Sequence, residues 1–540
     1  MEFNLADLFE AAVDAFGERE YLVAEGRRLT YAQMDEHANR LAHHLAAHGV
    51  GPGDHVGIYA LNSTEWVTTA WAVFKLRAVW VNINYRYVHD ELRYLFTNAD
   101  LVALVHQRQF SPRVAALLPE LSALHHIIVI DDDSQEPDPS PDAVGFEEAL
   151  ESGSPERDFG PRSGGDLYIL YTGGTTGMPK GVVWHHEDVF YALGGGIDAM
   201  TGTRMNRPEQ MVEKGQAQAG ALSFLPVAPL MHGATQWGVM GQSFTGNRIV
   251  LVAKFDPHEI WSIVEREKIN MVMITGDAMG KPLIETLDEP GASYDLSSLI
   301  GFTSTAALFS PSVKDEFFRH FPNLVLTDAI GSSESGNNGI THVKPGETAM
   351  KGGPTVTKVG ETVVFDEELN LVKPGSGVIG KIARAGNIPV GYYNDPEKTA
   401  EVFIHVDGKR YVMPGDFATV ETDGSVTLLG RGSICINSGG EKIFPEEVEA
   451  VVRSHPDVMD AIVVGAPDER FGQRVAAIVQ PRRGHAAPSL EAVQEHCRGH
   501  VAGYKVPRQL HVVDLIERSP SGKPDYRWAN TVVTTEPGAT

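Results

Sequence analysis

The chain has 540 residues, of which 42% are hydrophobic and 21% charged, and its formal net charge at pH 7 is −26. This length exceeds one ordinary hydrophobic core, so two to four lobes are expected. The negative charge argues against binding to a nucleic acid backbone or to an anionic membrane surface. The two cysteines, Cys435 and Cys497, exclude a disulfide framework and suit a reducing compartment.

The start of the chain and its hydropathy predict a cytoplasmic protein. The first residues, Met-Glu-Phe-Asn-Leu-Ala-Asp, lack the basic and apolar segments of a signal peptide. No run approaches the ~18 apolar residues that a membrane-spanning helix needs. We therefore expect no integral membrane association and no nucleic acid partner.

The first half of the chain alternates helical and strand patterns. Thr30 and Gln33 fit a capping box for a helix over residues 30–49, which Gly49 would end. Short apolar segments with strand character follow at 54–60, 79–83, 101–105, 127–130, 248–253, 271–274 and 324–326, many of them separated by helical segments. This alternation predicts a parallel sheet covered by helices on both faces.

The pattern of residues in the sequence changes at about residue 350. Segments 358–365 and 425–429 are short strands among frequent glycines, which indicates a β-rich subdomain. Beyond Gly430-Arg431, a helix from Pro445, two apolar strands and a helix from Ser489 predict a βαβ-type module of about 110 residues.

A glycine- and threonine-rich loop follows the strand-like residues 167–171. It runs Thr172, Gly173, Gly174, Thr175, Thr176, Gly177, Met178, Pro179 and Lys180. The glycines let the backbone turn and bring its N–H groups close to a ligand, while the hydroxyls and the lysine suit phosphate. The loop is not a Walker loop, because Gly-x-x-x-x-Gly-Lys-Ser/Thr occurs nowhere in the chain. Such a loop can also serve only to turn the chain.

Three further residues have both a chemical and a purely structural interpretation. His232 follows a proline-punctuated apolar run and could simply fill a corner of the core. Glu334 lies in a second Gly/Ser loop, where a carboxylate could hold Mg²⁺ opposite a phosphate. Lys523 stands on a Ser-Gly turn and could be an ordinary surface lysine. The histidine pairs at 43–44, 125–126 and 185–186 argue against a metalloenzyme, because adjacent side chains face apart on a strand and lie about 100° apart on a helix.

In their order along the chain, these motifs resemble the adenylate-forming superfamily, which includes acyl-CoA synthetases, luciferases and peptide-synthetase adenylation domains. The matching segments are Tyr171–Lys180, Gly331–Glu334, Gly415-Asp416, Gly430-Arg431, Gly439-Gly440-Glu441 with Pro445-Glu446-Glu447, and Ser521-Gly522-Lys523. Pro-Leu-Met-His-Gly-Ala-Thr-Gln-Trp and Gly-Arg-Gly-Ser-Ile-Cys-Ile-Asn-Ser-Gly-Gly-Glu-Lys are similar to actinobacterial FadD-type acyl-CoA synthetases, which activate steroid side-chain acids and long-chain fatty acids.

The resemblance implies an α/β fold with three parts. Residues 1–430 would form a large N-terminal adenylation domain of α/β-sheet subdomains and a β-rich subdomain. Residues 431–433 would be a hinge, with Ser433 at the position usually held by Asp or Lys. Residues 434–540 would form a small mobile α+β C-terminal domain that carries the catalytic lysine.

The implied activity is that of an ATP-dependent acyl-CoA ligase. A small-molecule carboxylic acid would react with ATP to give acyl-AMP and pyrophosphate, and CoA would then displace AMP to form a thioester. ATP, Mg²⁺ and CoA are thus the implied cofactors and co-substrates. Dimers are common in the family, and a homodimer is compatible with this sequence, which leaves the oligomeric state open.

The resemblance also implies roles for single residues. Lys523 would bridge the acyl carboxylate and the α-phosphate, Glu334 and Thr176 would hold Mg²⁺, and His232 would lie between the acyl pocket and the nucleotide. The implied ATP site comprises Thr172, Gly173, Gly174, Thr175, Thr176, Gly177, Met178, Pro179, Lys180, Ala307, Asp328, Ala329, Ile330, Gly331, Ser332, Ser333, Asp416, Arg431 and Lys523. The implied CoA contacts are Ser438, Gly439, Gly440 and Lys442.

Within the implied ATP site, Asp328 would accept a hydrogen bond from the adenine amino group. Asp416 and Arg431 would contact the ribose, and Ser333 the α-phosphate. The chain departs from the family pattern at Ile330, where an aromatic residue usually stacks on adenine. It departs again at residues 304–307, which replace a glycine-rich floor, and at Ser433.

Two other functions stay open at this point. The first is an adenylating enzyme that loads a carrier protein, although no carrier-attachment segment follows Lys523. The second is a non-catalytic acyl or nucleotide binder, which intact Lys180, Glu334 and Lys523 disfavour. Small residues at 194–196 and 233–234 predict room for a bulky acyl group, and this agrees equally with a steroid and with a long or branched chain.

Overall fold

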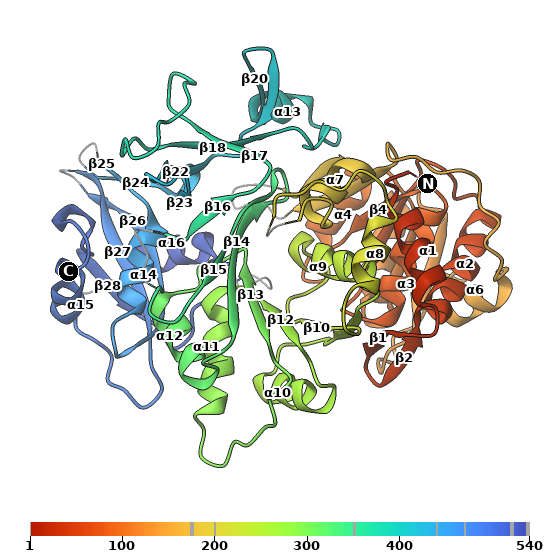
Figure 1. Ribbon diagram of the computed structural model, residues 1–540, viewed down its shortest axis with the longest axis horizontal. Helices are drawn as coiled ribbons and strands as arrows, with labels where there is room; N and C mark the ends of the chain where they lie inside the picture. The colour runs from red at the N-terminus through yellow and green to blue at the C-terminus, as the bar shows by residue number, and fades with distance from the viewer. Residues whose placement is uncertain are drawn as a thin grey trace. The chain divides into compact units, whose positions relative to one another are not determined.

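The computed structural model describes residues 2–172, 178–198, 201–348, 353–438, 441–468, 471–518 and 523–535 (Figure 1). The chain divides into two compact units. Unit 1 comprises residues 1–256, 262–273 and 387–403, and unit 2 comprises residues 257–261, 274–386 and 404–540.

A largely parallel sheet forms the centre of unit 1, in the strand order β19-β9-β8-β4-β3-β5-β6-β7. Its strands are β3 (His55–Tyr59), β4 (Val79–Asn82), β5 (Leu101–Gln107), β6 (His126–Ile130), β7 (Val144–Gly145), β8 (Leu167–Thr172), β9 (Lys180–His185) and β19 (Gly391–Tyr392). Strands β3 to β8 pair in parallel, whereas β8 and β9 form an antiparallel hairpin. The carboxyl ends of β3, β4, β5, β6 and β8 therefore lie at one edge of the sheet.

The helices of unit 1 include the one predicted over residues 30–49, which is α2. They are α1 (Leu5–Phe16), α2 (Tyr31–Ala47), α3 (Thr64–Lys75), α4 (His89–Asn98), α5 (Ser111–Leu117), α6 (Phe146–Ser152), α7 (His186–Leu193), α8 (Gln210–Gln216), α9 (Gly233–Ser243) and α13 (Pro396–Val402). The capping box of α2 is confirmed, since the Thr30 hydroxyl accepts from the Gln33 amide and the Gln33 side chain accepts from the Thr30 amide. Gly49, with φ of +87°, follows the helix.

A second group of strands in unit 1 has the order β2-β1-β11-β10-β12. These are β1 (Glu20–Ala24), β2 (Arg27–Thr30), β10 (Ser223–Pro226), β11 (Arg248–Leu251) and β12 (Met271–Ile274), and α10 (Pro257–Arg266) precedes β12. All neighbours pair in parallel except β1 and β2. The predicted strands near 248 and 271 are confirmed.

Unit 2 opens with α11 (Gly276–Leu287), β13 (Gly301–Thr305) and α12 (Pro311–His320). A long antiparallel arrangement follows, made of β14 (Val325–Ser332), β15 (Gly336–Val343), β16 (Thr355–Lys358), β17 (Glu361–Phe365), β18 (Gly380–Ala385), β20 (Phe403–Val406), β21 (Lys409–Val412), β22 (Asp416–Val420) and β23 (Val426–Arg431). This confirms the β-rich subdomain. Strand β14 continues well past the predicted apolar segment 324–326, because its polar residues pair with β13 and β15.

The last part of unit 2 is the predicted C-terminal module. It contains β24 (Ile436–Ser438), β25 (Glu441–Ile443), α14 (Pro445–Arg453), β26 (Val458–Asp468), β27 (Gly472–Pro481), α15 (Leu490–Arg498), β28 (Gln509–Val512) and α16 (Tyr526–Thr535). The predicted βαβ unit is confirmed, since β27 and β28 pair in parallel across α15. Cys497 of α15 is fully buried, and burial raises the pKa of its thiol to about 11.

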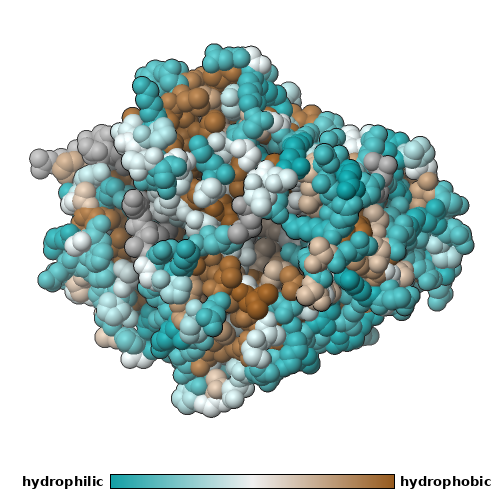
Figure 2. All heavy atoms as spheres, viewed as in Figure 1, coloured by the Kyte–Doolittle hydropathy of each residue, from teal (hydrophilic) through white to brown (hydrophobic). Residues whose placement is uncertain are grey.

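Hydrophilic residues predominate on the visible face of the part of unit 1 that carries α1, α2, α3 and α6 (Figure 2). Among the described residues, no helix combines the length and the apolar character needed to cross a membrane.

A buried lysine links α1, α2 and α3 in unit 1. The side chain of Lys75, the last residue of α3, has 0% exposure, and its ammonium group pairs with Glu10 and, at 2.8 Å, with Asp35. Arg157 adds a second cation 3.0 Å from Asp35. Burial alone would raise the pKa of Asp35, but the two cations outweigh it and lower that pKa from its ordinary value.

Replacing Lys75 tests how much its ion pairs with Glu10 and Asp35 stabilise unit 1. We expect Lys75→Met to lower the free energy of unfolding by about 3–5 kcal/mol at pH 7, because two carboxylates lose a buried cation. The measurement is urea unfolding followed by circular dichroism. The deficit should shrink as the pH falls below about 4, because protonation of Asp35 removes the charge that Lys75 balances.

Lys398→Met is the matched control. Lys398 pairs with Glu401 at 2.6 Å, but the two side chains are 34% and 67% exposed. An exposed pair contributes about 0–1 kcal/mol, so this variant should unfold close to the wild type. Equal effects of the two substitutions would contradict a special role for Lys75.

Candidate active site

The predicted phosphate loop lies at the tip of the β8–β9 hairpin in unit 1. Thr172 ends β8 and Lys180 begins β9, and the two residues face each other across the pair. Met178 is 39% exposed and Pro179 is buried. The predicted residues Gly173, Gly174, Thr175, Thr176 and Gly177 lie outside the described part of the chain.

Lys180 has a carboxylate partner next to this loop. Its ammonium group is hydrogen-bonded to Asp395, which also caps α13 by accepting from the Lys398 amide at 2.9 Å. The Lys180 hydrogen bond is the main cause that lowers the pKa of Asp395 from its ordinary value. The positive charge of Lys180, which the sequence predicts to contact phosphate, is therefore partly balanced by Asp395.

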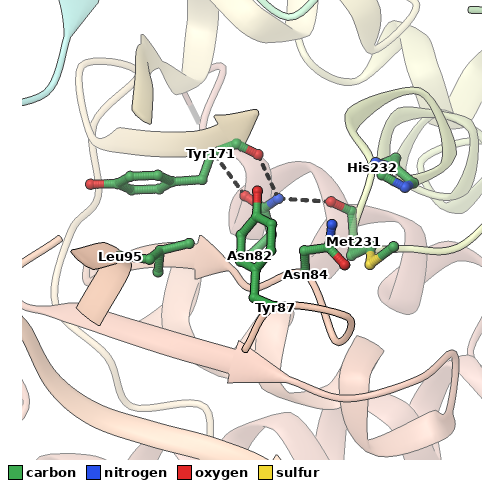
Figure 3. A pocket seen from close by; sticks show the side chains of 7 residues that line it. All are labelled: Asn82, Asn84, Tyr87, Leu95, Tyr171, Met231 and His232. Carbon is green, nitrogen blue, oxygen red and sulfur yellow. Dashed lines mark hydrogen bonds between the residues drawn. The ribbon is translucent and has the colours of Figure 1, made fainter. Parts of the chain in front are cut away.

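A small pocket lies beside the carboxyl end of β4. Its lining residues are Asn82, Asn84, Tyr87, Leu95, Tyr171, Met231 and His232 (Figure 3). It thus brings together the end of β8, which leads into the predicted phosphate loop, and the turn that carries His232.

Asn82 holds the two sides of this pocket together. Its carboxamide accepts from the Tyr171 amide at 2.8 Å and donates to the Tyr171 carbonyl at 2.9 Å and to the Met231 carbonyl at 2.7 Å. In Figure 3 Asn82 lies between Tyr171 and Met231. Sequence analysis missed Asn82. The available signal was a polar residue at the carboxyl end of an apolar parallel strand.

His232 is half-buried and precedes α9 as its N-cap residue. The next residue, Gly233, packs against β8, since a Cβ there would lie 2.5 Å from a methyl carbon of Leu170. A Cβ on Gly196 would likewise lie 2.6 Å from the Phe190 ring. Glycine is therefore needed for packing at both positions, and the expectation that residues 194–196 and 233–234 leave room for a bulky acyl group stays a prediction.

Most of the predicted adenine-site residues lie on one strand of unit 2. Asp328, Ala329, Ile330, Gly331 and Ser332 are consecutive in β14, and Ser333 and Glu334 form the turn into β15. Strand β13 pairs in parallel with β14, with Ser304 opposite Asp328 and Thr305 opposite Ala329. Ala307 follows β13, so the two predicted segments of the adenine site are neighbours.

The side chains of Asp328 and Ile330 are both buried in unit 2. Lys314 of α12, which sequence analysis missed, donates a hydrogen bond to the Asp328 carboxylate. Burial raises the pKa of Asp328, and the charge of Lys314 opposes that rise. Ile330 packs in a hydrophobic cluster with residues such as Val356 and Val364. Lys314 carried no sequence signal, because nothing local indicates that its helix position faces β14.

The residues predicted to contact ribose face each other at the ends of two strands. Asp416 begins β22 and Arg431 ends β23, and their Cα atoms are register partners. The chain then enters a short 3₁₀ turn over Gly432–Ile434, which contains the predicted hinge residue Ser433. The Gly432 amide donates to the Gly415 carbonyl at 3.1 Å, so the start of the turn is held beside the residue that precedes β22.

The predicted CoA loop is the tip of the β24–β25 hairpin. Ser438 pairs with Glu441, and Lys442 pairs with Asn437 on the opposite strand. Gly439 and Gly440 lie outside the described residues.

Lys523 is exposed and precedes an antiparallel bridge between Arg518 and Pro524. Arg518 forms an ion pair with Asp460 of β26 at 2.7 Å, which ties this stretch to the sheet of the module. Residues 519–522, which lie between Arg518 and Lys523, are outside the described part of the chain.

Within unit 2, α11 contacts the C-terminal module through polar groups. The buried Lys281 donates to the Met459 carbonyl, and burial lowers the pKa of its ammonium group. Glu285 lies 3.7 Å from Arg482, and Asp277 lies 4.0 Å from Arg453. These contacts hold the module against the helix that precedes the predicted adenine site.

Comparison with known proteins places these features in a family. The chain matches the model of the AMP-binding enzymes over residues 9–393 and that of the AMP-binding enzyme C-terminal domain over residues 447–523. The crystal structure of the anthranilate CoA ligase AuaEII with anthranoyl-AMP superposes with a TM-score of 0.84 at 23% identity, covering 99% of this chain and 98% of that chain. This likeness confirms the predicted α/β fold with a large N-terminal and a small C-terminal domain.

Two curated relatives match almost end to end. The chain is 49% identical over 533 residues to a 3-oxocholest-4-en-26-oate–CoA ligase of Rhodococcus rhodochrous, covering 98% of this chain and 96% of the relative. It is 51% identical over 540 residues to a medium/long-chain-fatty-acid–CoA/3-oxocholest-4-en-26-oate–CoA ligase of Mycolicibacterium smegmatis, covering 99% of this chain and 98% of the relative. The predicted resemblance is confirmed, and the chain belongs to the AMP-binding, adenylate-forming enzyme family.

Proposed function

We propose that this chain is an ATP-dependent acyl-CoA ligase that acts on steroid side-chain carboxylates and on medium- or long-chain fatty acids. The observation that carries the proposal is the identity of 49% and 51%, over nearly the whole length, to ligases named for these acids. Both the AMP-binding model and its C-terminal model match, so the parts needed for adenylation and for thioester formation are present.

In the first half-reaction, an oxygen of the acyl carboxylate attacks the α-phosphorus of ATP. The bond from the α-phosphorus to the bridging oxygen breaks, and pyrophosphate leaves. Negative charge grows on the phosphoryl oxygens, so preorganised positive and hydrogen-bonding groups stabilise the transition state. We assign Lys523 to the carboxylate and α-phosphate, and the segment from Thr172 to Lys180 to the departing phosphates.

Magnesium fits the donor set that the chain offers. Glu334 is half-buried in the β14–β15 turn, next to the predicted adenine strand, and its hard carboxylate oxygens are the ligands that Mg²⁺ prefers. With Thr176 as a second ligand, the ion would neutralise charge on the phosphates. The nucleotide contacts proposed for Asp328, Asp416 and Arg431 place adenine and ribose on the same unit as Glu334.

In the second half-reaction, the CoA thiolate attacks the acyl carbon of acyl-AMP and AMP leaves. We propose a domain boundary at residue 430, a hinge at 431–433 and a mobile domain over 434–540, so that Lys523 withdraws and the loop at Ser438–Lys442 approaches. Such a hinge concentrates large dihedral changes in a few residues. A homodimeric state and a cytoplasmic location stay predictions.

The substrate proposal is tested with the purified chain, ATP, Mg²⁺, CoA and an equimolar mixture of acids. The mixture holds steroid side-chain acids, C8 to C18 fatty acids and aryl acids, and products are identified by mass. We expect steroidyl-CoA and fatty acyl-CoA thioesters to dominate. Aryl-CoA as the main product would contradict the substrate class, and acyl-AMP without thioester would favour the carrier-loading alternative.

The Lys180–Asp395 pair predicts opposite effects of two substitutions on ATP binding. Lys180→Met should raise the KM for ATP roughly 10–100-fold, since a hydrogen bond to a charged group contributes about 1.5–3 kcal/mol. Asp395→Asn should lower that KM roughly 2–5-fold, because it removes a partly exposed competitor for Lys180 and still caps α13. Steady-state kinetics at saturating acid and CoA measures both values.

Glu401→Gln is the control for this pair, because it removes a charge from α13 without contacting Lys180. It should leave the KM for ATP unchanged. A raised KM in Asp395→Asn would show that Asp395 positions Lys180 for ATP and does not compete for it.

The contacts between α11 and the C-terminal module predict that a substitution of Lys281 changes the rates of the two half-reactions by different factors. If the module moves during the cycle, Lys281→Met removes a contact made in only one of its positions. We therefore expect the rates of pyrophosphate release and of acyl-CoA formation from acyl-AMP to change by different factors, at least ~10-fold apart, since a lost charged hydrogen bond contributes about 1.5–3 kcal/mol. Single-turnover assays measure the two steps separately.

Lys505→Met is the control, because Lys505 pairs at 2.6 Å with Glu447 inside the module. It should change the two steps by the same factor. Equal changes in Lys281→Met as well would argue against a rearrangement that breaks the Lys281 contact.

A further inference from the structure

Three histidines from separate parts of unit 1 meet outside the predicted active site. They are His44 in the last turn of α2, His48 at the end of that helix and His126 at the start of β6. One ring nitrogen from each lies within 4.8 Å of the others. His44 and His126 are buried, whereas His48 is exposed. The Nε2 atoms of His44 and His126 are 3.0 Å apart.

The hydrogen bonds of two rings leave their Nε2 atoms as electron-pair donors. His44 Nδ1 lies 2.7 Å from the Ser152 hydroxyl, which itself donates to the Ala149 carbonyl, so Nδ1 must carry the proton. His48 Nδ1 lies 2.8 Å from the His44 carbonyl, which only accepts, so this Nδ1 is protonated too. A metal-binding histidine usually donates its other N–H to a hydroxyl or carbonyl in this way.

The kind of donor atom narrows the choice of metal. Imidazole nitrogens select zinc and similar divalent transition metals over Mg²⁺.

The cluster lies at the edge of the sheet opposite to the predicted active site. His126 is the first residue of β6, and β6 runs parallel to β5, β3 and β4. Asn82 and Thr172 stand at the carboxyl ends of β4 and β8, at the other edge. Helices α2 and α6, which supply His44, His48 and Ser152, pack side by side (Figure 1).

We propose that His44, His48 and His126 bind one Zn²⁺ ion through their Nε2 atoms, with water as the fourth ligand. The ion would replace the hydrogen bond in which His126 Nε2 donates to His44 Nε2, and the His126 proton would move to Nδ1. Tetrahedral Zn–N bonds of about 2.0–2.1 Å place two ligand nitrogens ~3.3 Å apart, close to the separation of His44 and His126. The His48 ring is stacked on His126, with centroids 4.2 Å apart and planes 14° apart, so it must turn to direct Nε2 at the ion, and its Nδ1 bond to the His44 carbonyl must adjust with it. Its exposure permits this rotation.

Only two of the three histidines are close together in the sequence. His44 and His48 are four residues apart, so they share one face of a helix. One member of each adjacent pair, His44 of 43–44 and His126 of 125–126, joins the cluster, whereas His43 pairs with Asp158. His126 reaches it only because β6 begins beside the end of α2. A bound ion would thus cross-link α2 to β6.

Zinc binding to the full-length chain tests the proposal. Purification tags are removed, and Zn²⁺ is titrated calorimetrically at pH 7.5 with Mg²⁺ present, with Co²⁺ absorption as a second measurement of tetrahedral nitrogen ligation. We expect one Zn²⁺ per chain and a raised melting temperature. His48→Gln, at an exposed position that should not disturb folding, should weaken Zn²⁺ binding at least ~10-fold.

Two further variants separate ligation from nonspecific binding. Ser152→Ala should weaken Zn²⁺ binding roughly 10-fold, because Ser152 holds the His44 ring in its ligating tautomer. His43→Gln is the matched control, since His43 is adjacent on α2 but contacts Glu156 and Asp158. It should bind Zn²⁺ like the wild type. Wild-type binding weaker than millimolar, or equal binding by His48→Gln and the wild type, would overturn the proposal.

Discussion

The geometry of the predicted active site depends on the hydrogen bonds of the buried Asn82 carboxamide. Strands β4 and β8 are register partners only at Val81 and Ile169, and beyond that point the Asn82 side chain takes over the role of a backbone neighbour. It accepts from the Tyr171 amide, donates to its carbonyl and uses its remaining donor for Met231. One side chain thus sets where the phosphate loop begins and where the turn before His232 lies. An apolar substitute would leave buried groups unsatisfied at about 1–3 kcal/mol each.

Charge pairing is the second constraint, because an acidic chain must bind an anionic nucleotide. Local cations are needed, and two of them are held by carboxylates in the structure. Lys180 pairs with Asp395 near the phosphate loop, and Lys314 pairs with Asp328 in the adenine strand. The first pair is partly exposed, so phosphate oxygens can replace the aspartate. The second is buried, so it is suited to orient Asp328 and less suited to exchange partners.

Sequence reasoning succeeded where the signal was local. The Thr30–Gln33 capping box, the apolar strands of the parallel sheet and the β27–α15–β28 unit could be predicted because helix caps and hydrophobic periods are written in neighbouring residues. It failed where a role depends on distant residues. Asn82 is hydrogen-bonded to Tyr171 and Met231, and Lys314 to Asp328. These partners are distant in the sequence, so the residues around Asn82 and Lys314 could not reveal them. The packing of Gly196 against Phe190 and of Gly233 against Leu170 could not be predicted for the same reason.

The polarity of the parallel sheet explains how one unit can carry two independent sites. The carboxyl ends of the parallel strands β3, β4, β5, β6 and β8 point to the edge where the β8–β9 loop begins and His232 lies, and the residues of unit 1 that are predicted to act in adenylation gather there. His44, His48 and His126 lie at the amino ends of these strands, at the edge opposite to the residues predicted to act in adenylation. A metal ion at that edge would fix the junction of α2 and β6, two elements whose contact otherwise depends on helix packing and on the short hydrogen-bonded chain from His126 through His44 to Ser152. Its effect would be on the stability of unit 1, while the loop at the other edge keeps its own anchor, Asn82.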